Sequence, residues 1–437
     1  MINIQSNSTS RAIRLSLCVW AVSAFGFPEG ARAGHGPGEQ QLVDRVVHAL
    51  SKTAPIAKVK QVQTNDWVWV ELKYQDEQYP LTIDVLGSRN GCPPRKVLYM
   101  LSVSGMNFQS TYFTPMHDNL AQFFRKHGYL VVGITARENA VPAGADCSPL
   151  AEWGLKKHKK DVRKIVDVVR RRLGLRYDLF GFSYAGATVL DYAASYDDRL
   201  DKVIVADLFA FDPVTETNQI QTALHLQNCL NQMIGEGTYV DDSLAQLKYL
   251  TAMATVDPDG DSGVPRALVG LPLEGAFTYD GLLHFWMIYS GLLAGDHTAL
   301  SGLPRDWPLL MSTLSGTYEL AADPLDDRFG FTYTDQSLIR LASLKNGSGI
   351  IPLALLRDVT ATAAGSGSYR IRWDDIDERV VWVNSALGYG DQNHAAQLIR
   401  QGGNRHVSVS VIEGYGNADL LFSSTAEEDV WRLFLTR

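Results

Sequence analysis

The 437-residue sequence has few cysteines, no internal repeats and no excess of basic residues. Its four cysteines and ten histidines do not show the spacing of a zinc site, and no glycine-rich loop has phosphate-binding spacing. Acidic residues outnumber basic ones by 48 to 40, which gives a formal charge of −8 and argues against a nucleic-acid partner. We therefore expect no metal ion, no cofactor and no nucleic acid.

The first 33 residues form a segment of their own. Arg11 and Arg14 precede the apolar run "LSLCVWAVSAFGF", and "ARA" ends at Ala33. This layout is typical of a secretory signal peptide, and the run is too short to span a bilayer comfortably; the alternative is a buried N-terminal helix. Removing residues 1–33 changes the formal charge from 40 − 48 = −8 to 37 − 47 = −10. We therefore predict a soluble mature chain, secreted or periplasmic, without stable membrane insertion.

Three cysteines remain after such a cleavage: Cys92, Cys147 and Cys229. In an oxidising compartment, three cysteines can form one disulfide at most. The pair Cys92 and Cys147 is the better candidate, because both residues lie in predicted loops of the same domain.

Apolar patterning predicts strands that alternate with helices. Residues 67–74 and 79–87 alternate apolar and polar side chains around a short polar turn, which predicts an antiparallel hairpin. Further apolar runs predict strands at 96–105, 129–136, 177–183, 202–209, 379–386 and 406–414. Helical spacing occurs between them, at 116–128 and 155–174. This alternation predicts an α/β fold with a mainly parallel central sheet and helices on both faces.

The alternation of strands and helices is interrupted once, between the predicted strands at 202–209 and 379–386. Residues 212–370 have helical and loop-like patterns broken by Pro and Gly. We interpret them as a mostly helical cap, inserted between the two parts of a core at 34–211 and 371–437. The cap is rich in Leu, Met, Phe, Trp and Tyr. Those side chains not needed for its own core are expected to line a mainly apolar cleft for a lipophilic small molecule.

The stretch "YDLFGFSYAGATVLDYAASY" places Ser183 between an apolar strand and a helix. A serine at so sharp a turn has its hydroxyl exposed above the sheet, and small neighbours such as Gly181 and Gly186 let the backbone segments approach each other. The start of the helix directs N–H groups toward developing negative charge. Ser183 could instead simply cap a helix, but the order of strand, turn and helix favours a nucleophile.

This arrangement resembles the α/β-hydrolase superfamily, in particular serine esterases and peptidases with a large cap. The resemblance covers most of the predicted mature chain outside the cap. It implies an oxyanion hole formed by the residue after the nucleophile and by the loop after the third strand, here "SVSGMNFQS". The backbone N–H groups of Met106 and Tyr184 are therefore the expected donors. The usual His-Gly pair of the family is Ser104-Gly105 in this sequence.

The resemblance also implies an acid after the strand that follows the cap. The loop there, "LGYGDQNH", contains one acid, Asp391, while Gly388 occupies the usual position. Asp391 could instead cap the following helix. Asp207 and Asp212, after the strand that leads into the cap, are the alternative acids.

The triad histidine of the family would follow the last strand, in the stretch "EGYGNADLLF", but position 417 is asparagine. A general base needs a conjugate acid with a pKa near the working pH, and an amide takes up no proton there. Loss of the base in a hydrolytic triad costs on the order of a million-fold in turnover. The intact surroundings of Asn417 favour an active progenitor enzyme with histidine at this position, of which the present chain is a strongly impaired form.

Other histidines are poor substitutes for this base. His406 begins the last predicted strand, about 23 Å from its catalytic end at 3.3 Å per residue. His394 follows Asp391 and could reach the site only through an unusual loop geometry. His225, His284 and His297 lie in the cap. We expect each of them to be a surface or packing histidine.

The sequence thus predicts an exported serine hydrolase that cleaves a bulky, lipophilic carboxylic ester or lactone through an acyl-enzyme. One alternative is a proline-type or tripeptidyl aminopeptidase of the same fold, in which Glu274 or Glu319 of the cap would hold the substrate's amino terminus. Another is a homologue that binds a ligand without hydrolysing it. The oligomeric state is left open.

Overall fold

The computed structural model describes residues 40–436 apart from 90–92, 197–198, 270–273, 289–311 and 366–368. The chain divides into two units, Met1–Pro37 and Gly38–Arg437, and all the described residues belong to the second. The predicted signal peptide, Cys92 and His297 lie outside the described residues. Cys147 has a free thiol, which does not support its pairing with Cys92.

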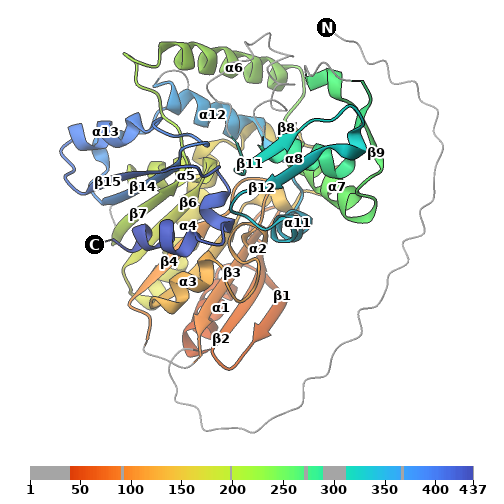
Figure 1. Cartoon of the computed structure of the whole chain (residues 1–437). Coiled ribbons are helices and arrows are strands. Elements are labelled where there is room, and N and C mark those ends of the chain that lie inside the picture. Colours follow the sequence, from red (N-terminus) through yellow and green to blue (C-terminus); the bar gives the residue numbers. More distant parts are fainter. Residues whose placement is uncertain are drawn as a thin grey trace. The chain divides into compact units, whose positions relative to one another are not determined.

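A nine-stranded sheet forms the centre of the second unit (Figure 1). Its strands, in sheet order, are β1 (Ile56–Gln63), β2 (Trp67–Tyr74), β3 (Leu81–Ser88), β5 (Tyr129–Thr135), β4 (Lys96–Leu101), β6 (Tyr177–Phe182), β7 (Leu200–Ala206), β14 (Arg379–Ser385) and β15 (Val407–Ile412). The pairs β1–β2, β2–β3 and β3–β5 are antiparallel, and the remaining neighbours are parallel. The predicted hairpin and the mainly parallel sheet are confirmed.

Strand β1 was not predicted from the sequence. Most of its residues are exposed, and Lys58 and Lys60 lie within it. It forms an edge of the sheet, where lysines discourage pairing with another chain. Because so little of β1 is buried, it lacks the apolar signal that marks the central strands.

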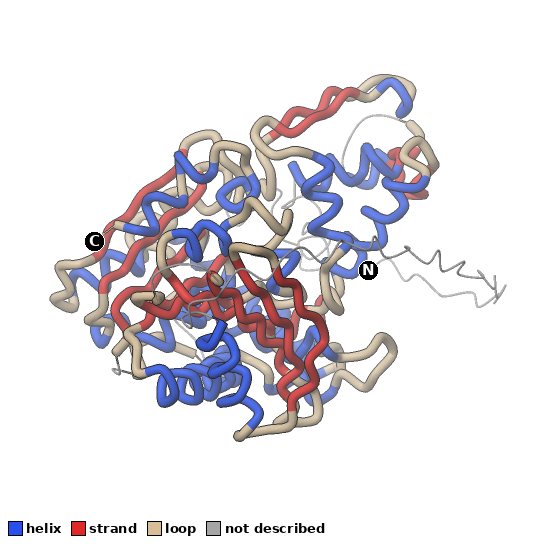
Figure 2. The backbone as a smooth tube through the Cα atoms, turned by 90° about the horizontal axis from the view of Figure 1, so that it is seen from below, coloured by secondary structure: helices blue, strands red, loops and turns tan. Residues whose placement is uncertain are grey.

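Helices cover both faces of the sheet, as Figures 1 and 2 show. Helices α1 (Gln40–Ser51), α4 (Leu155–Leu173) and α5 (Tyr184–Ala193) share one hydrophobic core, while α3 (Leu120–Lys126) belongs to another. Strand β6 contributes to both cores, with Leu179 in the first and Phe180 in the second. This alternation is that of a strand buried on both faces, and it explains the continuous apolar run in the sequence.

The segment predicted to be a cap leaves the sheet after β7 and returns at β14, and these two strands are direct neighbours. Its elements are α6 (Thr217–Gly235), β8 (Val240–Asp241), α7 (Ser243–Val256), β9 (Asp261–Pro265), η3 (Arg266–Val269), β10 (Ala276–Thr278), α8 (Tyr279–Ile288), β11 (Gly316–Glu319), η4 (Pro324–Asp326), β12 (Arg328–Phe331), α11 (Gln336–Leu344), β13 (Ile351–Pro352) and α12 (Leu353–Ala363). The strands form three small antiparallel pairs. Helices predominate, as expected.

Short elements complete the described part of the chain. They are α2 (Phe108–Tyr112), η1 (Arg137–Ala140), η2 (Ser148–Glu152), η5 (Trp373–Asp375), α13 (His394–Gln401), α14 (Asp419–Phe422), α15 (Ala426–Asp429) and η6 (Trp431–Leu435). None of the helices in the described ranges has the length and apolar character needed to cross a membrane.

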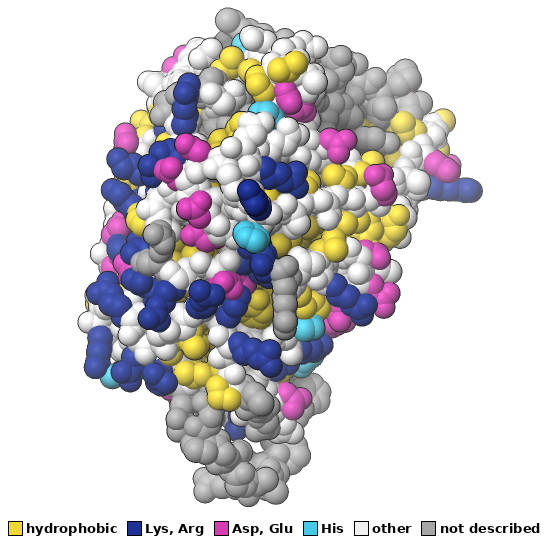
Figure 3. Space-filling model, turned by 90° about the vertical axis from the view of Figure 1, so that its left-hand side faces the viewer, with side chains coloured by type: hydrophobic (Ala, Val, Ile, Leu, Met, Phe, Trp, Pro, Cys, Tyr) yellow, Lys and Arg dark blue, Asp and Glu magenta, His cyan; other side chains and the backbone are white. Residues whose placement is uncertain are grey.

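The basic face of α4 is paired with carboxylates. Lys159 contacts Asp191 at 2.9 Å, and Arg163 contacts Asp167 at 3.1 Å. Across the face in Figure 3, Lys and Arg side chains have Asp and Glu side chains among them. This arrangement is that of a solvated surface with mixed charges.

Gly181, two residues before the predicted nucleophile, provides a test of the local packing. A Cβ atom at this position would lie 2.4 Å from the carbonyl oxygen of Ala185. We expect Gly181→Ala to lower the free energy of unfolding by roughly 2 kcal/mol or more, since backbone atoms would have to move. Gly235→Ala is the matched control, because no atom lies within 4 Å of the added Cβ. Equal urea-unfolding midpoints for the two variants would contradict this account of the turn.

Candidate active site

Ser183 lies at the turn between β6 and α5 with φ 53° and ψ −132°. A positive φ is unfavourable for a residue with a side chain, so surrounding contacts must hold this conformation. The Ser183 N–H donates to the carbonyl of Ala206 at 2.8 Å, and the Gly186 N–H donates to the carbonyl of Ser183 at 2.8 Å. The strained turn expected for a nucleophile is therefore present, but Ser183 is only 5% exposed, in contrast to the exposed hydroxyl that the sequence predicts.

The two expected oxyanion donors differ in their availability. Tyr184 is the first residue of α5, so its N–H has no partner within the helix. The N–H of Met106 instead donates to the carbonyl of Val103 at 2.9 Å. Gly105, which directly precedes Met106 in this turn, has φ 80°, a conformation that favours glycine. In this conformation Tyr184 can offer its N–H to an anion, whereas the N–H of Met106 is engaged in a local turn.

Asp207 follows β7 directly, and its side chain is completely buried. Its carboxylate accepts hydrogen bonds from the Ser385 N–H at 2.9 Å, from the Ser385 hydroxyl at 3.0 Å and from the Tyr389 N–H at 3.3 Å. The fourth donor is the Asn417 side-chain amide, whose Nδ2 lies 2.6 Å from Oδ2 of Asp207. The structure thus pairs position 417 with Asp207.

Asp391, the first choice from the sequence, is not brought to Asn417. Its side chain is exposed. Gly388, which occupies the usual position of the acid, is the physical reason for this difference. A Cβ atom at 388 would lie 2.2 Å from Oδ2 of Asp207, so the carboxylate from β7 fills the space that a side chain of this loop would need.

Asp212, the other alternative acid, has a local role. Its carboxylate accepts the N–H of Val214 at 2.7 Å and lies 3.5 Å from Nδ1 of His394. These contacts place Asp212 at the turn into α6. They also show that the carboxylate near His394 is Asp212, not Asp207. Of the three acids considered, Asp207 is the one in contact with Asn417.

Burial raises the pKa of Asp207 to about 6, although the hydrogen bonds from Ser385, Asn417 and Tyr389 act in the opposite direction. The carboxylate therefore changes its charge in a range close to neutral pH. An imidazolium at position 417 would stabilise the charged form, whereas the neutral amide of Asn417 supplies only a hydrogen bond.

The loop that carries Asn417 is fixed by the neighbouring cap segment. The Asn417 N–H donates to the Ser312 carbonyl at 2.9 Å. Asp419, fully buried, accepts the N–H groups of Gly416 at 2.9 Å and Ser315 at 2.7 Å. A Cβ at Gly416 would lie 2.8 Å from backbone atoms of Leu314, so glycine permits this close approach. Asn417 is thus held rigidly beside Asp207.

Tyr389 is a site residue that the sequence analysis missed. Its buried side chain lies beside those of Ser183 and Tyr184, and its backbone N–H donates to Asp207. Burial raises the pKa of Tyr389 well above its ordinary value. Tyr389 therefore stays protonated near neutral pH and cannot serve as the base for Ser183. The only signal in the sequence is its place in the loop that was expected to carry the acid.

The described histidines have other surroundings. His284 packs against Phe329 and Phe331 in the cap, with ring centroids 4.2 and 4.5 Å apart. His158 is paired with Glu138. The partners that Asp207 has among the described residues do not include a histidine.

Glu274 and Glu319, the carboxylates considered for an aminopeptidase, are both exposed. An exposed carboxylate forms only a weak ion pair with an amino group, so these two residues give no specific support to that alternative.

The topology and the turn at Ser183 define the α/β-hydrolase fold. Similar solved structures include a candidate lipase from Sulfolobus solfataricus, at 15% sequence identity and a TM-score of 0.53, with 87% of this chain and 97% of that chain covered. A thermostable carboxyl esterase from Bacillus coagulans is similar at 13% identity and a TM-score of 0.41, with 85% and 93% covered. No family model and no curated protein sequence matches the chain. The chain therefore has the fold of the α/β-hydrolase superfamily.

The raised pKa of Asp207 predicts a pH-dependent stability. Because the folded pKa of about 6 exceeds the ordinary 3.8, this group favours folding fully at pH below about 4, and the contribution is lost as pH rises through 6. The loss corresponds to about 3 kcal/mol. In Asp207→Asn it should be absent, so the stability of the parent relative to this variant should fall between pH 4 and pH 7. The measurement is the free energy of unfolding in urea at each pH. A difference between the unmodified chain and Asp207→Asn that stays constant from pH 4 to pH 7 would contradict this assignment.

Proposed function

We propose that this chain is an exported serine hydrolase of the carboxylic ester class whose base position is occupied by Asn417. The observation that carries the proposal is the 2.6 Å hydrogen bond from the Asn417 amide to buried Asp207, on the sheet edge where Ser183 follows β6. In this proposal Ser183 is the nucleophile, Asp207 is the triad acid, and Asn417 takes the place of the proton carrier. Turnover by the present chain is then absent or strongly impaired.

The proposed chemistry begins with attack of the Ser183 hydroxyl on an ester or lactone carbonyl. The oxyanion that forms would accept the Tyr184 N–H at the start of α5. The serine proton must leave as the bond forms and must later reach the alkoxide leaving group. Tyr389 cannot take it, for the reason given above, and the Asn417 amide has no suitable pKa. The missing step is therefore proton transfer rather than substrate binding.

A bulky, lipophilic acyl or alkoxy group suits the composition of the cap. Leu282, Leu283, Phe285 and Met287 of α8 are buried in a core, so contacts with such a group would fall to partly buried apolar side chains of the cap, such as Leu244 and Trp286. The candidate lipase of similar fold supports a carboxylic ester in preference to an amide. A lactone differs from an ester only in that its leaving group stays attached.

We expect Asn417→His to raise hydrolysis of a panel of nitrophenyl esters by about a thousand-fold or more, because a base returns beside Asp207 and Ser183. Asn417→Gln is the matched control, since it changes the side chain but adds no base. Ser183→Ala or Asp207→Ala in the Asn417→His background should remove the gain. An Asn417→His variant that folds, shows the same unfolding midpoint and gains nothing would refute the proposed triad.

The reactivity of Ser183 in the parent chain gives an independent test. A serine-directed fluorophosphonate needs an activated hydroxyl, so we expect slow labelling of the parent and rapid labelling of Asn417→His, followed by mass spectrometry of the peptide that contains Ser183. Rapid labelling of the unmodified chain at Ser183 would show that another base is present and would overturn our account of position 417.

A second function is favoured by the satisfied state of the site. Ser183 lies beside Tyr389, and the partner of Asp207 is the neutral amide of Asn417, so the site could hold a neutral ligand without a base to turn it over. In that case the parent would retain an ester ligand intact at equilibrium, and Asn417→His would weaken binding without adding hydrolysis. Equilibrium dialysis with product analysis distinguishes the two functions.

A further inference from the structure

The loop that precedes α2, Ser104 to Met106, is held from one side by η1. The Ser104 hydroxyl donates to Oε1 of Glu138 at 2.5 Å. The amide of Asn139 donates to the Met106 carbonyl at 2.8 Å. Consecutive residues of η1 thus form hydrogen bonds with both ends of this three-residue loop. We call residues 104–106 the oxyanion loop. Ser104 stands where the resemblance placed a histidine.

Cap residues hold the same loop from the other side. The Gly349 N–H donates to the Gly105 carbonyl at 3.1 Å. The Ser348 hydroxyl donates to the Glu138 carbonyl at 2.7 Å, so the cap contacts η1 as well. The loop therefore lies between two elements that are far apart in the sequence.

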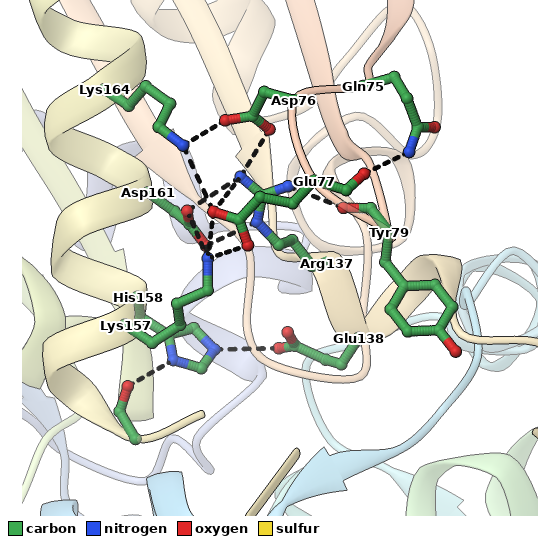
Figure 4. Close-up of polar contacts among 11 residues, drawn as sticks. Gln75, Asp76, Glu77, Tyr79, Arg137, Glu138, Lys157, His158, Asp161 and Lys164 are labelled. Carbon is green, nitrogen blue, oxygen red and sulfur yellow. Dashed lines mark hydrogen bonds and ion pairs between the residues drawn. The ribbon is translucent and has the colours of Figure 1, made fainter. Parts of the chain in front are cut away.

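Glu138 is 1% exposed and is paired with His158 of α4 (Figure 4). Nε2 of His158 lies 3.3 Å from Oε1 of Glu138, the same oxygen that accepts the Ser104 hydroxyl, and Nδ1 lies 2.9 Å from the Gly154 carbonyl. Both ring nitrogens thus face acceptors, which is the arrangement of an imidazolium. Burial alone would lower the pKa of His158, but the charge of Glu138 outweighs it and the pKa is raised.

The neighbouring charged groups are balanced among themselves. Figure 4 shows Arg137 with Asp161 and Asp76, together with the lysines that contact the same carboxylates. These groups are Asp76, Glu77 and Asp161 on the acidic side and Arg137, Lys157 and Lys164 on the basic side. Asp161 also faces His158 from α4, and Asp358 faces it from α12. His158 is therefore the counterion of Glu138, while the larger network is neutral without it.

The loop and the start of α5 share a small cavity. Ser104, His158 and Tyr184 all line it, together with Ser102. Movement of Ser104 would therefore change the surroundings of Tyr184, whose N–H is the available oxyanion donor.

We propose that Glu138 and His158 are positioning residues for the oxyanion loop: the Glu138 carboxylate, with its charge balanced by His158, holds Ser104 and thereby fixes the backbone of Gly105 and Met106 beside Tyr184. This inference rests on the proposed function in one respect, since it treats Tyr184, which lines the same cavity as Ser104, as the oxyanion donor. The structural part, that Glu138 and His158 order the loop, applies to the parent chain without any catalysis.

Amide hydrogen exchange of the peptide that covers residues 102–107 tests this structural part in the parent chain. Ser104→Ala removes the bond to Glu138 and should raise exchange by about tenfold, the factor that one such hydrogen bond supplies. Ser102→Ala is the matched control, because Ser102 is equally buried and its hydroxyl lies 3.2 Å from that of Thr135 instead. Equal exchange in the two variants would overturn the proposal.

The pH dependence of the same exchange separates positioning from simple packing. The folded pKa of His158 is raised, so the charged pair persists below it and is lost as pH rises through it. After normalisation to a peptide from α4, loop protection should fall over that range in the parent and should be flat in Ser104→Ala and in His158→Gln. A parent profile as flat as that of the variants would contradict the role of His158.

The catalytic part is tested in the Asn417→His background. There Ser104→Ala should lower kcat by about tenfold to a hundredfold with little change in KM, because a displaced Ser104 would disturb the Tyr184 N–H across the cavity that they share, and an oxyanion donor acts in the transition state. Unchanged kcat with Ser104→Ala would overturn the catalytic part. If Asn417→His gains no activity while the exchange of Ser104→Ala rises as expected, the proposed function fails and the ordering of the loop by Glu138 stands.

Discussion

A buried hydrogen bond between the Asp207 carboxylate and the Asn417 amide joins segments that are far apart in the chain. The carboxylate also binds the backbone after β14 through Ser385 and Tyr389, so one side chain organises the ends of β7, β14 and the loop after β15. A fully buried carboxylate needs such donors, since each one lost would leave charge without compensation. In the function that we propose, the site has the architecture of a triad without its proton carrier.

Much of this arrangement could be predicted from local patterns. Ser183 and Asn417 follow strands with strong apolar signals, and their positions at the ends of those strands depend on a few neighbouring residues. The choice between Asp207 and Asp391 could not be made in this way, because it depends on the space beside Gly388, which only the assembled sheet defines. Strand β1 was missed because it buries few side chains.

Two other features of the site could not be predicted from the sequence. Met106 was expected to donate to an oxyanion, but its N–H is engaged by Val103, and a loop conformation of this kind has no signature in composition. Tyr389 contacts Ser183 only because the loop after β14 folds back over Asp207. The loop that contains Met106 is held by η1 on one side and by the cap on the other. An account of activity must therefore include the loop as well as the triad positions.

The central claim is that position 417 is the base position of an otherwise assembled site. A crystal structure of Asn417→His after reaction with a fluorophosphonate tests it most directly. We predict a phosphonyl group on the Ser183 hydroxyl oxygen, with the introduced imidazole donating to Asp207 in place of the Asn417 amide. An imidazole turned away from Asp207, or an unmodified Ser183 in crystals exposed to the reagent, would contradict the account.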